Sequence, residues 1–504
     1  MSDIYIPGVR SRFNSEKIIE DLMRLERVPR DRAESNIEQI NTEKSYWQEI
    51  SSRTKALGES ARQLFSFQNP FNDRSIRSSD EAVLTGTAVR EASEQELSFT
   101  VKQLAASDRF LSSPLSEDFM VEGGTYTFTI GKDEISFEFK GGTIREFSDA
   151  LNRRGGDKLQ SNVIAVKPGT RSLLIESKVQ GEENRLGFAG AAIALGEITG
   201  MIERVNGDDG AAGFRPLNAV STARDAIISM EGIEIQRPSN EINDLIPGIT
   251  ITAKNVSDKP VKLQVETDGD AIKEAIINLV GNYNRLMAEI NVLSSFRGLK
   301  GESDDTRVID ELTYLTSEER ADYRKKLGAF QGDSTLMQMR NSLMRIVSSS
   351  YPTSEDSTLT LLAQIGVGTD VRRSGGTDVS RLRGYLEIDE KVLDAAIASK
   401  LPAVRQLFGF DTTGDLLVDS GIAYSLDALT KPYTESTGLF TQKTNNLNSR
   451  IDQESRRIAT LDRQLASKEA ELKKQYGLME SAYARMEQMS TSFDRFSQQN
   501  SNNN

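Results

Sequence analysis

Cysteine and histidine are both missing from this chain of 504 residues, and tryptophan occurs once. A chain without cysteine suits a protein that crosses a secretion channel unfolded, although many bacterial cytosolic proteins also lack cysteine. The lack of histidine excludes catalytic triads that use it, and the lack of both residue types excludes tetrahedral zinc sites. The composition therefore removes several common classes of catalytic and metal site.

Long apolar segments are also absent. No run of 18 apolar residues could span a membrane, and the first nine residues lack the basic and apolar regions of a signal peptide. The net charge is −13, of which residues 1–65 contribute 0 and residues 441–504 contribute +2, so the middle of the chain holds −15. An acidic middle argues against a nucleic-acid partner, because phosphates attract basic surfaces.

The last sixty residues carry an apolar residue at every seventh position. This spacing is typical of a coiled coil, because it keeps one stripe of a helix facing a partner over many turns. The second seam position is mixed, since Leu447 and Leu461 are apolar whereas Glu454, Lys468 and Gln475 are polar. We expect one helix of roughly 55 residues that needs a partner helix to cover it. Its stripe consists of Ile451, Ile458, Leu465, Leu472, Met479, Met486 and Phe493.

Two helices are expected near the other end of the chain. Asn14 or Ser15 can cap a first helix that ends before Pro29, and Pro29 suits the first turn of a second, longer helix. The lone tryptophan lies on the second helix, where we expect core packing, with a contact to a partner subunit as the alternative. Residues 1–13 are expected to be a flexible lead-in. The apolar stripe of the second helix consists of Ile37, Ile40, Trp47, Ile50, Leu57, Ala61 and Leu64.

The middle of the chain changes character at residues 69–71. From 83 to 265, short runs rich in Thr, Val, Ile and Phe alternate with polar residues, and residues 131–134 are expected to turn a hairpin. Helical spacing returns after Asp270. These patterns predict an α+β multidomain protein with long terminal helices that form a coiled coil, a helix-rich leg domain and an inserted antiparallel β head of one or two domains.

Four parts are predicted within this fold. The terminal coiled coil comprises residues 1–45 and 455–504, of which about the last ten are flexible, and the mainly helical domain comprises 46–80 and 268–454. The β head comprises 81–115 and 216–267, with a second, variable head domain at 116–215.

No constellation in the chain points to catalysis. Gly409 and Gly414 have the glycine spacing of a phosphate-binding loop, but Asp415 and Leu416 stand where lysine and serine or threonine are required. Acidic residues at 208–209 and 302–305 lack the twelve-residue ligand ladder of a calcium loop, so solvated loops are expected. No carboxylate pair is singled out for glycoside hydrolysis. We therefore predict no enzyme activity, no catalytic residues, no cofactor and no metal.

Short motifs in a fixed order resemble the family of flagellar filament capping proteins, also called hook-associated protein 2. Each motif is weak alone, but the ordered set covers nearly the whole chain, apart from a head region at 106–215 where only the general shape matches. The motifs lie at 18–23 (IIEDLM), 26–29 (ERVP), 46–47 (YW), 101–105 (VKQLA), 246–250 (IPGIT), 283–284 (YN), 332–334 (GDS), 362–366 (LAQIG), 384–389 (GYLEID) and 404–409 (VRQLFG).

The resemblance implies a structural cap at the distal tip of the bacterial flagellar filament, required for elongation because it promotes folding and insertion of exported flagellin. It implies a ring-shaped homo-oligomer of four to six copies, with five expected. It also implies partners: flagellin, the filament end, and a cytosolic export chaperone on the C-terminal helix. Export would follow the flagellar type III route, to the outside or to the periplasm in bacteria with periplasmic flagella, and the exposed head could act in adhesion.

Three readings of the chain therefore differ in class. The first is the filament cap, in which the apolar stripes listed above, together with Leu447 and Leu461, are the coiled-coil and assembly residues. The second is another flagellar axial protein, such as a hook–filament junction protein or a flagellin-like protein, which shares paired terminal helices but not the motifs between 332 and 409. The third is an enzyme or a stand-alone adhesin.

Overall fold

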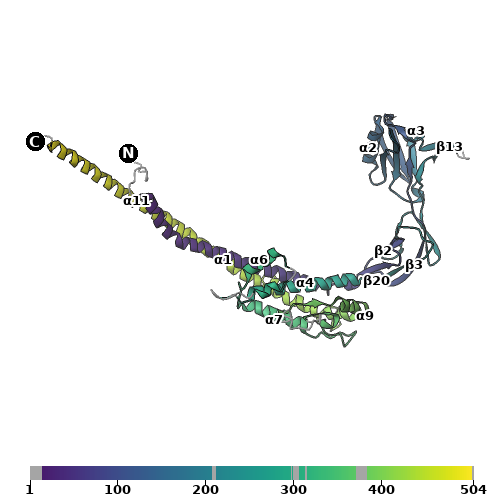
Figure 1. The fold of residues 1–504 in the computed structure, drawn as a ribbon. Coiled ribbons are helices and arrows are strands. Elements are labelled where there is room, and N and C mark those ends of the chain that lie inside the picture. The colour runs from purple at the N-terminus through teal and green to yellow at the C-terminus, as the bar shows by residue number, and fades with distance from the viewer. Residues whose placement is uncertain are drawn as a thin grey trace. The chain divides into compact units, whose positions relative to one another are not determined.

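The computed structural model describes residues 14–206, 212–296, 298, 306–312, 315–369 and 383–501. The chain divides into a helical unit, Met1–Asn69 with Ile272–Asn504, and a β unit, Pro70–Ala271. Both units are visible in Figure 1. The predicted α+β architecture, with long terminal helices and inserted antiparallel sheets, is confirmed. The finer division into four parts stays a prediction.

A single long helix, α1 (Ser15–Gln63), stands where two helices were expected. The predicted break at Pro29 was wrong, since Pro29 lies inside α1, and Asn14 makes no side-chain cap hydrogen bond. Proline removes one backbone donor and leaves one carbonyl without its helical partner. Here the side chains of residues 24–29 are all exposed, so water can bind that carbonyl and the helix continues.

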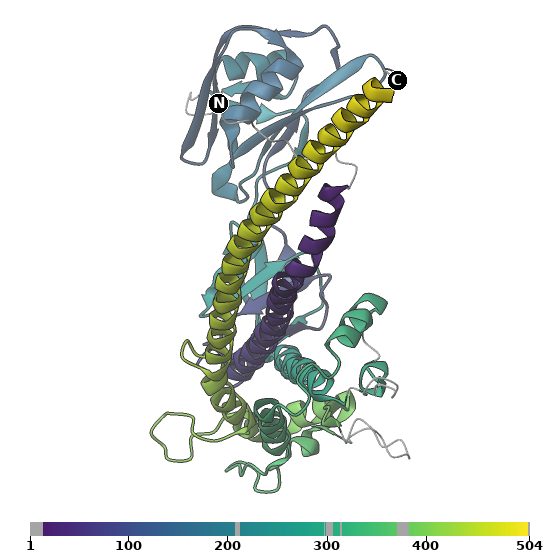
Figure 2. The ribbon, with the colours of Figure 1, turned by 90° about the vertical axis from the view of Figure 1, so that its left-hand side faces the viewer.

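The second long helix, α11 (Leu439–Ser501), has 63 residues. It packs along α1, and α10 (Ile422–Thr434) also packs against α1. Figure 2 shows α1 in purple beside α11 in yellow. The close approach of α10 depends on Gly58, where an added Cβ would lie 2.5 Å from the hydroxyl oxygen of Thr430.

The rest of the helical unit surrounds the C-terminal half of α1. Its core includes the fully buried side chains of Leu57, Leu64, Tyr283, Phe408 and Phe440. The remaining elements are α4 (Gly269–Ser294), α5 (Arg307–Asp310), α6 (Ser317–Lys326), α7 (Ser334–Ser348), η3 (Leu362–Ile365), β21 (Val367–Gly368), β22 (Glu387–Ile388), α9 (Glu390–Phe408) and α10 (Ile422–Thr434).

The β unit has two separate hydrophobic cores. The first core, which includes Phe99, Ile228 and Leu263, lies between a five-stranded and a three-stranded antiparallel sheet. The five-stranded sheet has the order β1 (Arg74–Ser78), β20 (Val261–Thr267), β3 (Gln95–Gln103), β16 (Ala226–Met230), β17 (Ile233–Arg237). The three-stranded sheet has the order β18 (Glu241–Ile246), β19 (Ile249–Ala253), β2 (Leu84–Ala88). A short helix, η1 (Pro70–Asn72), precedes β1.

The second core of the β unit includes Phe128, Phe147 and Ile175. The expected hairpin is confirmed, because β7 ends at Ile130 and β8 begins at Asp133 in antiparallel register. The strands of this part are β4 (Arg109–Leu111), β5 (Leu115–Ser116), β6 (Met120–Val121), β7 (Gly124–Ile130), β8 (Asp133–Phe139), β9 (Gly142–Thr143), β10 (Leu159–Ile164), β11 (Thr170–Ser177), β12 (Leu186–Gly190), β13 (Ile202–Asn206), β14 (Ala212–Pro216) and β15 (Ala219–Ser221). The helices are α2 (Ile144–Gly155), η2 (Glu182–Asn184) and α3 (Ala191–Ile198).

Candidate functional site

The paired helices α1 and α11 form the candidate site. Buried contacts around Trp47 hold the two helices together at one end. Trp47 is 2% exposed, so the expected core position is confirmed. Its ring stacks on Phe330 with centroids 4.5 Å apart, and Phe440 of α11 lies at 5.8 Å. The ammonium of Lys443 lies 4.1 Å from the centre of the indole ring. Aromatic and cation–π contacts of this kind fix α11 against α1.

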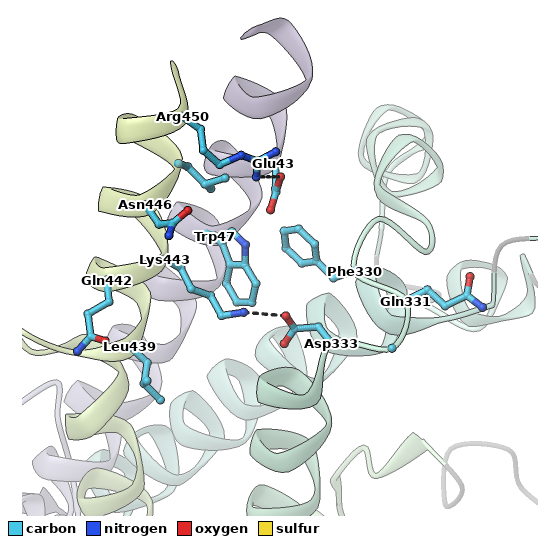
Figure 3. Close-up of a pocket in the computed structure, with 12 residues that line it drawn as sticks. Glu43, Trp47, Phe330, Gln331, Asp333, Leu439, Gln442, Lys443, Asn446 and Arg450 are labelled. Carbon is cyan, nitrogen blue, oxygen red and sulfur yellow. Dashed lines mark hydrogen bonds and ion pairs between the residues drawn. The ribbon is translucent and has the colours of Figure 1, made fainter. Parts of the chain in front are cut away.

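A pocket of about 620 Å³ opens beside this cluster. Figure 3 shows how Lys443 and Asp333 point toward one another across it, and their charged atoms lie 2.7 Å apart. Arg450 of α11 pairs with Glu43 of α1 at 3.7 Å. The pocket is lined by Glu43, Trp47, Phe330, Gln331, Gly332, Asp333, Leu439, Gln442, Lys443, Asn446, Leu447 and Arg450.

Asp333 has two roles at the edge of this pocket. Its carboxylate caps α7 by accepting hydrogen bonds from the backbone N–H groups of Thr335 and Leu336. Burial alone would raise the pKa of Asp333, but Lys443 and the two N–H groups outweigh burial, so the pKa lies below its ordinary value. The carboxylate therefore stays charged at neutral pH, and the ion pair with α11 persists.

The predicted stripes meet over only part of their length, near the pair of Glu43 with Arg450, whereas the end of α1 packs on α10, where Arg62 pairs with Asp427. On α1, Ile40, Trp47, Ile50 and Leu57 are buried, as is the C-cap residue Leu64, and Ile37 is half-buried. On α11, Leu447 and Leu472 are buried, whereas Ile451, Ile458, Leu461 and Leu465 are half-buried. A small cluster of Ile19, Met23 and Leu472 closes the far end of the covered seam.

Ion pairs and hydrogen bonds accompany this seam. The Arg30 guanidinium of α1 lies 3.2 Å from the Asp462 carboxylate of α11. The hydroxyl of Ser15, at the start of α1, donates a hydrogen bond to Glu480 of α11. The two helices are therefore antiparallel, and α11 continues for about six turns beyond Glu480 at 3.6 residues per turn.

The polar seam positions stay partly in water. Glu454 pairs with Arg457 at 3.6 Å, and Lys468 pairs with Glu471 at 3.3 Å, each within α11. Gln475 donates a hydrogen bond to the Glu471 carboxylate at 3.0 Å. None of these contacts crosses to α1, so they contribute little to the stability of the packing between the two helices.

Apolar side chains are exposed at the far end of the pair. The last three residues of the predicted stripe, Met479, Met486 and Phe493, are 46%, 63% and 73% exposed, and Met489 is 67% exposed. All side chains from 481 to 495 are exposed. In the structure, α1 therefore covers the first part of the α11 stripe, and the last part of the stripe is exposed.

A second exposed stripe lies on α1. Ile18, Leu22 and Leu25 are 37%, 39% and 68% exposed, whereas their neighbours Ile19 and Met23 face α11. Sequence reasoning placed these residues on one helix but missed that they form two faces. The signal was present, since apolar residues recur four positions apart in two adjacent registers.

A buried cluster of charges supports the site from within the helical unit. Glu289 of α4 is fully buried, 3.2 Å from the Lys326 ammonium and 3.3 Å from the Arg53 guanidinium. Glu49 pairs with both of these cations. Burial raises the pKa of Glu289, whereas for Glu49 the two cations outweigh burial and lower the pKa. Sequence reasoning missed this cluster, which ties α1 to α4 and α6.

Some predicted features fall outside the described residues. These are the lead-in at 1–13 and the acidic residues at 208–209 and 302–305. Among the helices that the structure describes, none combines the length and the apolar character needed to cross a lipid bilayer.

The comparisons with known proteins agree with this arrangement. The family model "Flagellar hook-associated protein 2 C-terminus" matches residues 223–488, and the corresponding N-terminus model matches residues 11–108. Flagellar hook-associated protein 2 of Treponema maltophilum is 30% identical, with 89% of this chain and 92% of that protein covered. The Treponema pallidum protein of the same name is 27% identical over the same shares of the two chains.

A solved structure shows the same fold. The D1-D2-D3 domains of the flagellar cap protein FliD from Escherichia coli superpose with a TM-score of 0.51 at 21% sequence identity, and the match covers 80% of this chain and 99% of that one. The assignment of the chain to a family rests on the two family models and the relatives from Treponema, whereas the superposition shows the fold alone. This chain belongs to the flagellar hook-associated protein 2 family.

Proposed function

We propose that this chain caps the distal end of the flagellar filament and attaches to it through the paired helices α1 and α11. The single observation that carries the proposal is the exposed apolar stripe of Met486, Met489 and Phe493 on the part of α11 beyond Glu480. A contiguous apolar surface on a soluble chain marks a binding site for another protein. The apolar stripes Ile37 to Leu64 on α1 and Leu447 to Phe493 on α11 are the assembly residues of this proposal.

The cap acts as a ring-shaped homo-oligomer of four to six copies, with five expected. Flagellin subunits that emerge at the tip fold and insert beneath it, and the elongation of the filament depends on this. The seam between α1 and α11 supports such a role, because several of its positions are polar or half-buried. A seam of moderate stability lets the paired helices α1 and α11 release and rebind as each flagellin subunit is added.

Further partners belong to the same proposal. The C-terminal helix is held by a cytosolic chaperone before export along the flagellar type III route, since its apolar stripe is exposed until a partner covers it. The chain then acts at the tip of an external flagellum, or of a periplasmic one in bacteria that have such flagella. The β unit is the part available for adhesion. The chain is a structural protein rather than an enzyme.

A complementation experiment tests this function. A mutant that lacks this chain should release flagellin into the medium and grow no filaments, because nothing holds the subunits at the tip. Expression of the full chain should restore filament length, measured by electron microscopy, and remove monomeric flagellin from the culture supernatant. Filaments of normal length in the mutant would refute the cap function.

Replacing Lys468 with leucine should tighten the helix pair. Lys468 occupies a seam position whose side chain is 44% exposed, and a leucine there buries additional apolar area against α1. We expect a higher thermal unfolding midpoint, by a few degrees, and slower filament elongation in cells. Lys474→Leu on an exposed position of the same helix is the control. An unchanged elongation rate in a stabilised Lys468→Leu chain would show that the polar seam is merely solvated.

A further inference from the structure

The loop between α9 and α10 presents two leucines to solvent. Leu416 is 93% exposed and Leu417 is 68% exposed. Leu416 also adopts a left-handed backbone conformation, with φ of 70°, which is unfavourable for a bulky side chain. Figure 2 shows the yellow-green loop as an open lobe that projects from the helices. A glycine or polar residue would suit an isolated loop better, so the exposed leucine pair suggests that the loop contacts another surface.

The loop is held in one conformation by its own carboxylates. Asp411 accepts hydrogen bonds from the backbone N–H groups of Gly414 at 2.6 Å and Leu416 at 2.7 Å. Asp419 accepts from the backbone N–H and the hydroxyl of Thr412 at 3.0 and 2.7 Å. A preorganised loop loses little conformational entropy when it binds, which favours its use as an anchor.

An apolar pocket of about 340 Å³ lies elsewhere in the same helical unit. Its lining includes Val347 at the end of α7, Leu361, Leu362 and Ala363 around η3, and Leu386 before β22. An apolar cavity of about 150 Å³ is large enough to hold a benzene ring, so this pocket has room for a leucine pair. The Leu416 side chain is exposed and therefore does not fill this pocket in its own chain.

The charges of the loop and the pocket are complementary. The loop carries Asp411, Asp415 and Asp419, and Asp415 accepts only the backbone N–H of Leu417, at 3.0 Å, among the interactions of the described residues. Arg345 of α7 lines the pocket and its side chain is exposed, and the ion pairs found among the described residues do not include it. The acidic loop and the apolar pocket with Arg345 in its lining are therefore complementary in charge.

We propose that the leucine pair of one copy inserts into this pocket of a second copy, with Asp415 facing Arg345. The occupant is a second copy because a ring of more than two subunits needs two different, complementary surfaces on every subunit. The loop and the pocket supply such a pair within one helical unit. The contact rests on the ring-shaped oligomer of the proposed function and assigns part of its interface.

Cysteine cross-linking tests this contact directly, because the chain contains no cysteine of its own. One preparation carries Leu416→Cys and another carries Ala363→Cys, which is an exposed position on the pocket wall. After mixing and oxidation we expect a disulfide-linked dimer, since a disulfide requires Cα atoms within about 7 Å. Neither preparation alone should cross-link, and Met337→Cys, 53% exposed on α7, replaces Ala363→Cys as the control. Equal yields with the control would overturn the contact.

Charge and apolar substitutions provide a second measurement. Leu416→Asp combined with Leu417→Asp should weaken self-association at least about tenfold in sedimentation equilibrium, whereas Met337→Asp should leave it unchanged. Arg345→Glu should also weaken it, and Asp415→Lys added to Arg345→Glu should restore it. The loop is exposed, so circular dichroism should show normal folding of each variant.

The outcomes separate this contact from the cap function. Unchanged self-association of the double aspartate variant, in a chain that restores filaments, would overturn the contact and leave the cap intact. A wild-type chain that does not self-associate at all would overturn the contact as well. If the mutant lacking the chain grows normal filaments, the cap function fails whatever the cross-linking shows.

Discussion

Deleting residues 441–504 should abolish filament elongation and send flagellin into the culture medium. The deletion removes the α11 half of the seam, including Leu447 and Leu472, and removes Lys443 from its place above Trp47. It also removes the whole exposed stripe of α11. Electron microscopy of cells and immunoblots of the supernatant measure the result. Normal filaments without released flagellin would show that the terminal helices do not attach the cap.

A shorter truncation separates attachment from folding. A chain that ends at Glu480 keeps the hydrogen bond from Ser15 and the cluster around Leu472, but it loses Met486, Met489 and Phe493. Because the lost side chains are exposed, the free energy of unfolding should change by about 0.5 kcal/mol or less. Elongation should nevertheless fail.

A full-length variant serves as the companion to this truncation. Met486→Ser, Met489→Ser and Phe493→Ser together should reproduce the loss of elongation, because they remove only the apolar stripe. The matched control carries Ala482→Ser, Ala484→Ser and Gln488→Ser, which are exposed positions of the same helix segment. The control should elongate filaments normally, and equal loss of elongation in both triple variants would indicate that any change in this helix segment impairs the chain.

Replacing Lys326 with methionine should lower the free energy of unfolding of the helical unit by about 3–5 kcal/mol at neutral pH. Lys326 lies 3.2 Å from Glu289, whose side chain has no exposed surface, and it also pairs with Glu49. Without the ammonium, the buried Glu289 carboxyl has Arg53 as its remaining cation. Chemical denaturation followed by circular dichroism measures the loss.

The pH dependence of this loss has a definite sign. The lowered pKa of Glu49 contributes stability that is present above its unfolded pKa of 4.5 and is lost as the pH falls through the folded value. The raised pKa of Glu289 acts in the opposite sense, so its contribution is present below pH 4.5 and is lost as the pH rises through the folded value. Both carboxyls are protonated in acid, so the difference between wild type and Lys326→Met should shrink there.

Two variants control this prediction. Lys325→Met, at a 73% exposed neighbour that pairs with Asp322, should change stability little. Glu289→Met added to Lys326→Met should recover much of the loss, because it removes the uncompensated buried charge while Glu49 and Arg53 still pair at 2.7 Å. A Lys326→Met chain as stable as wild type at pH 7 would contradict the importance of the cluster.

The sequence predicted the terminal helices well because their signal is periodic. The seven-residue spacing from Ile451 onward identified α11, and the stripe from Ile37 to Leu64 identified its partner. The spacing could not show where the partner ends. That depends on the start of α1 at Ser15, which faces Glu480 and leaves Met486 and Phe493 beyond it.

Two other features show why local rules fail. Pro29 was expected to break α1, but a proline on an exposed helix face removes a hydrogen bond that water can replace. Glu289 lies in a mainly apolar stretch of α4, which was a usable sign of a buried charge. Its partners Lys326 and Arg53 come from distant segments, so only the tertiary structure identifies them.

Binding of the purified chain to filament ends tests the attachment through α11 most directly. Fluorescently labelled full-length chain and the chain ending at Glu480 are added separately to filaments whose own caps have been removed, and the fraction of ends labelled is counted by microscopy. We predict labelled ends with the full-length chain and only background labelling with the shortened chain, although both are folded. Equal labelling of filament ends by both chains would contradict the account.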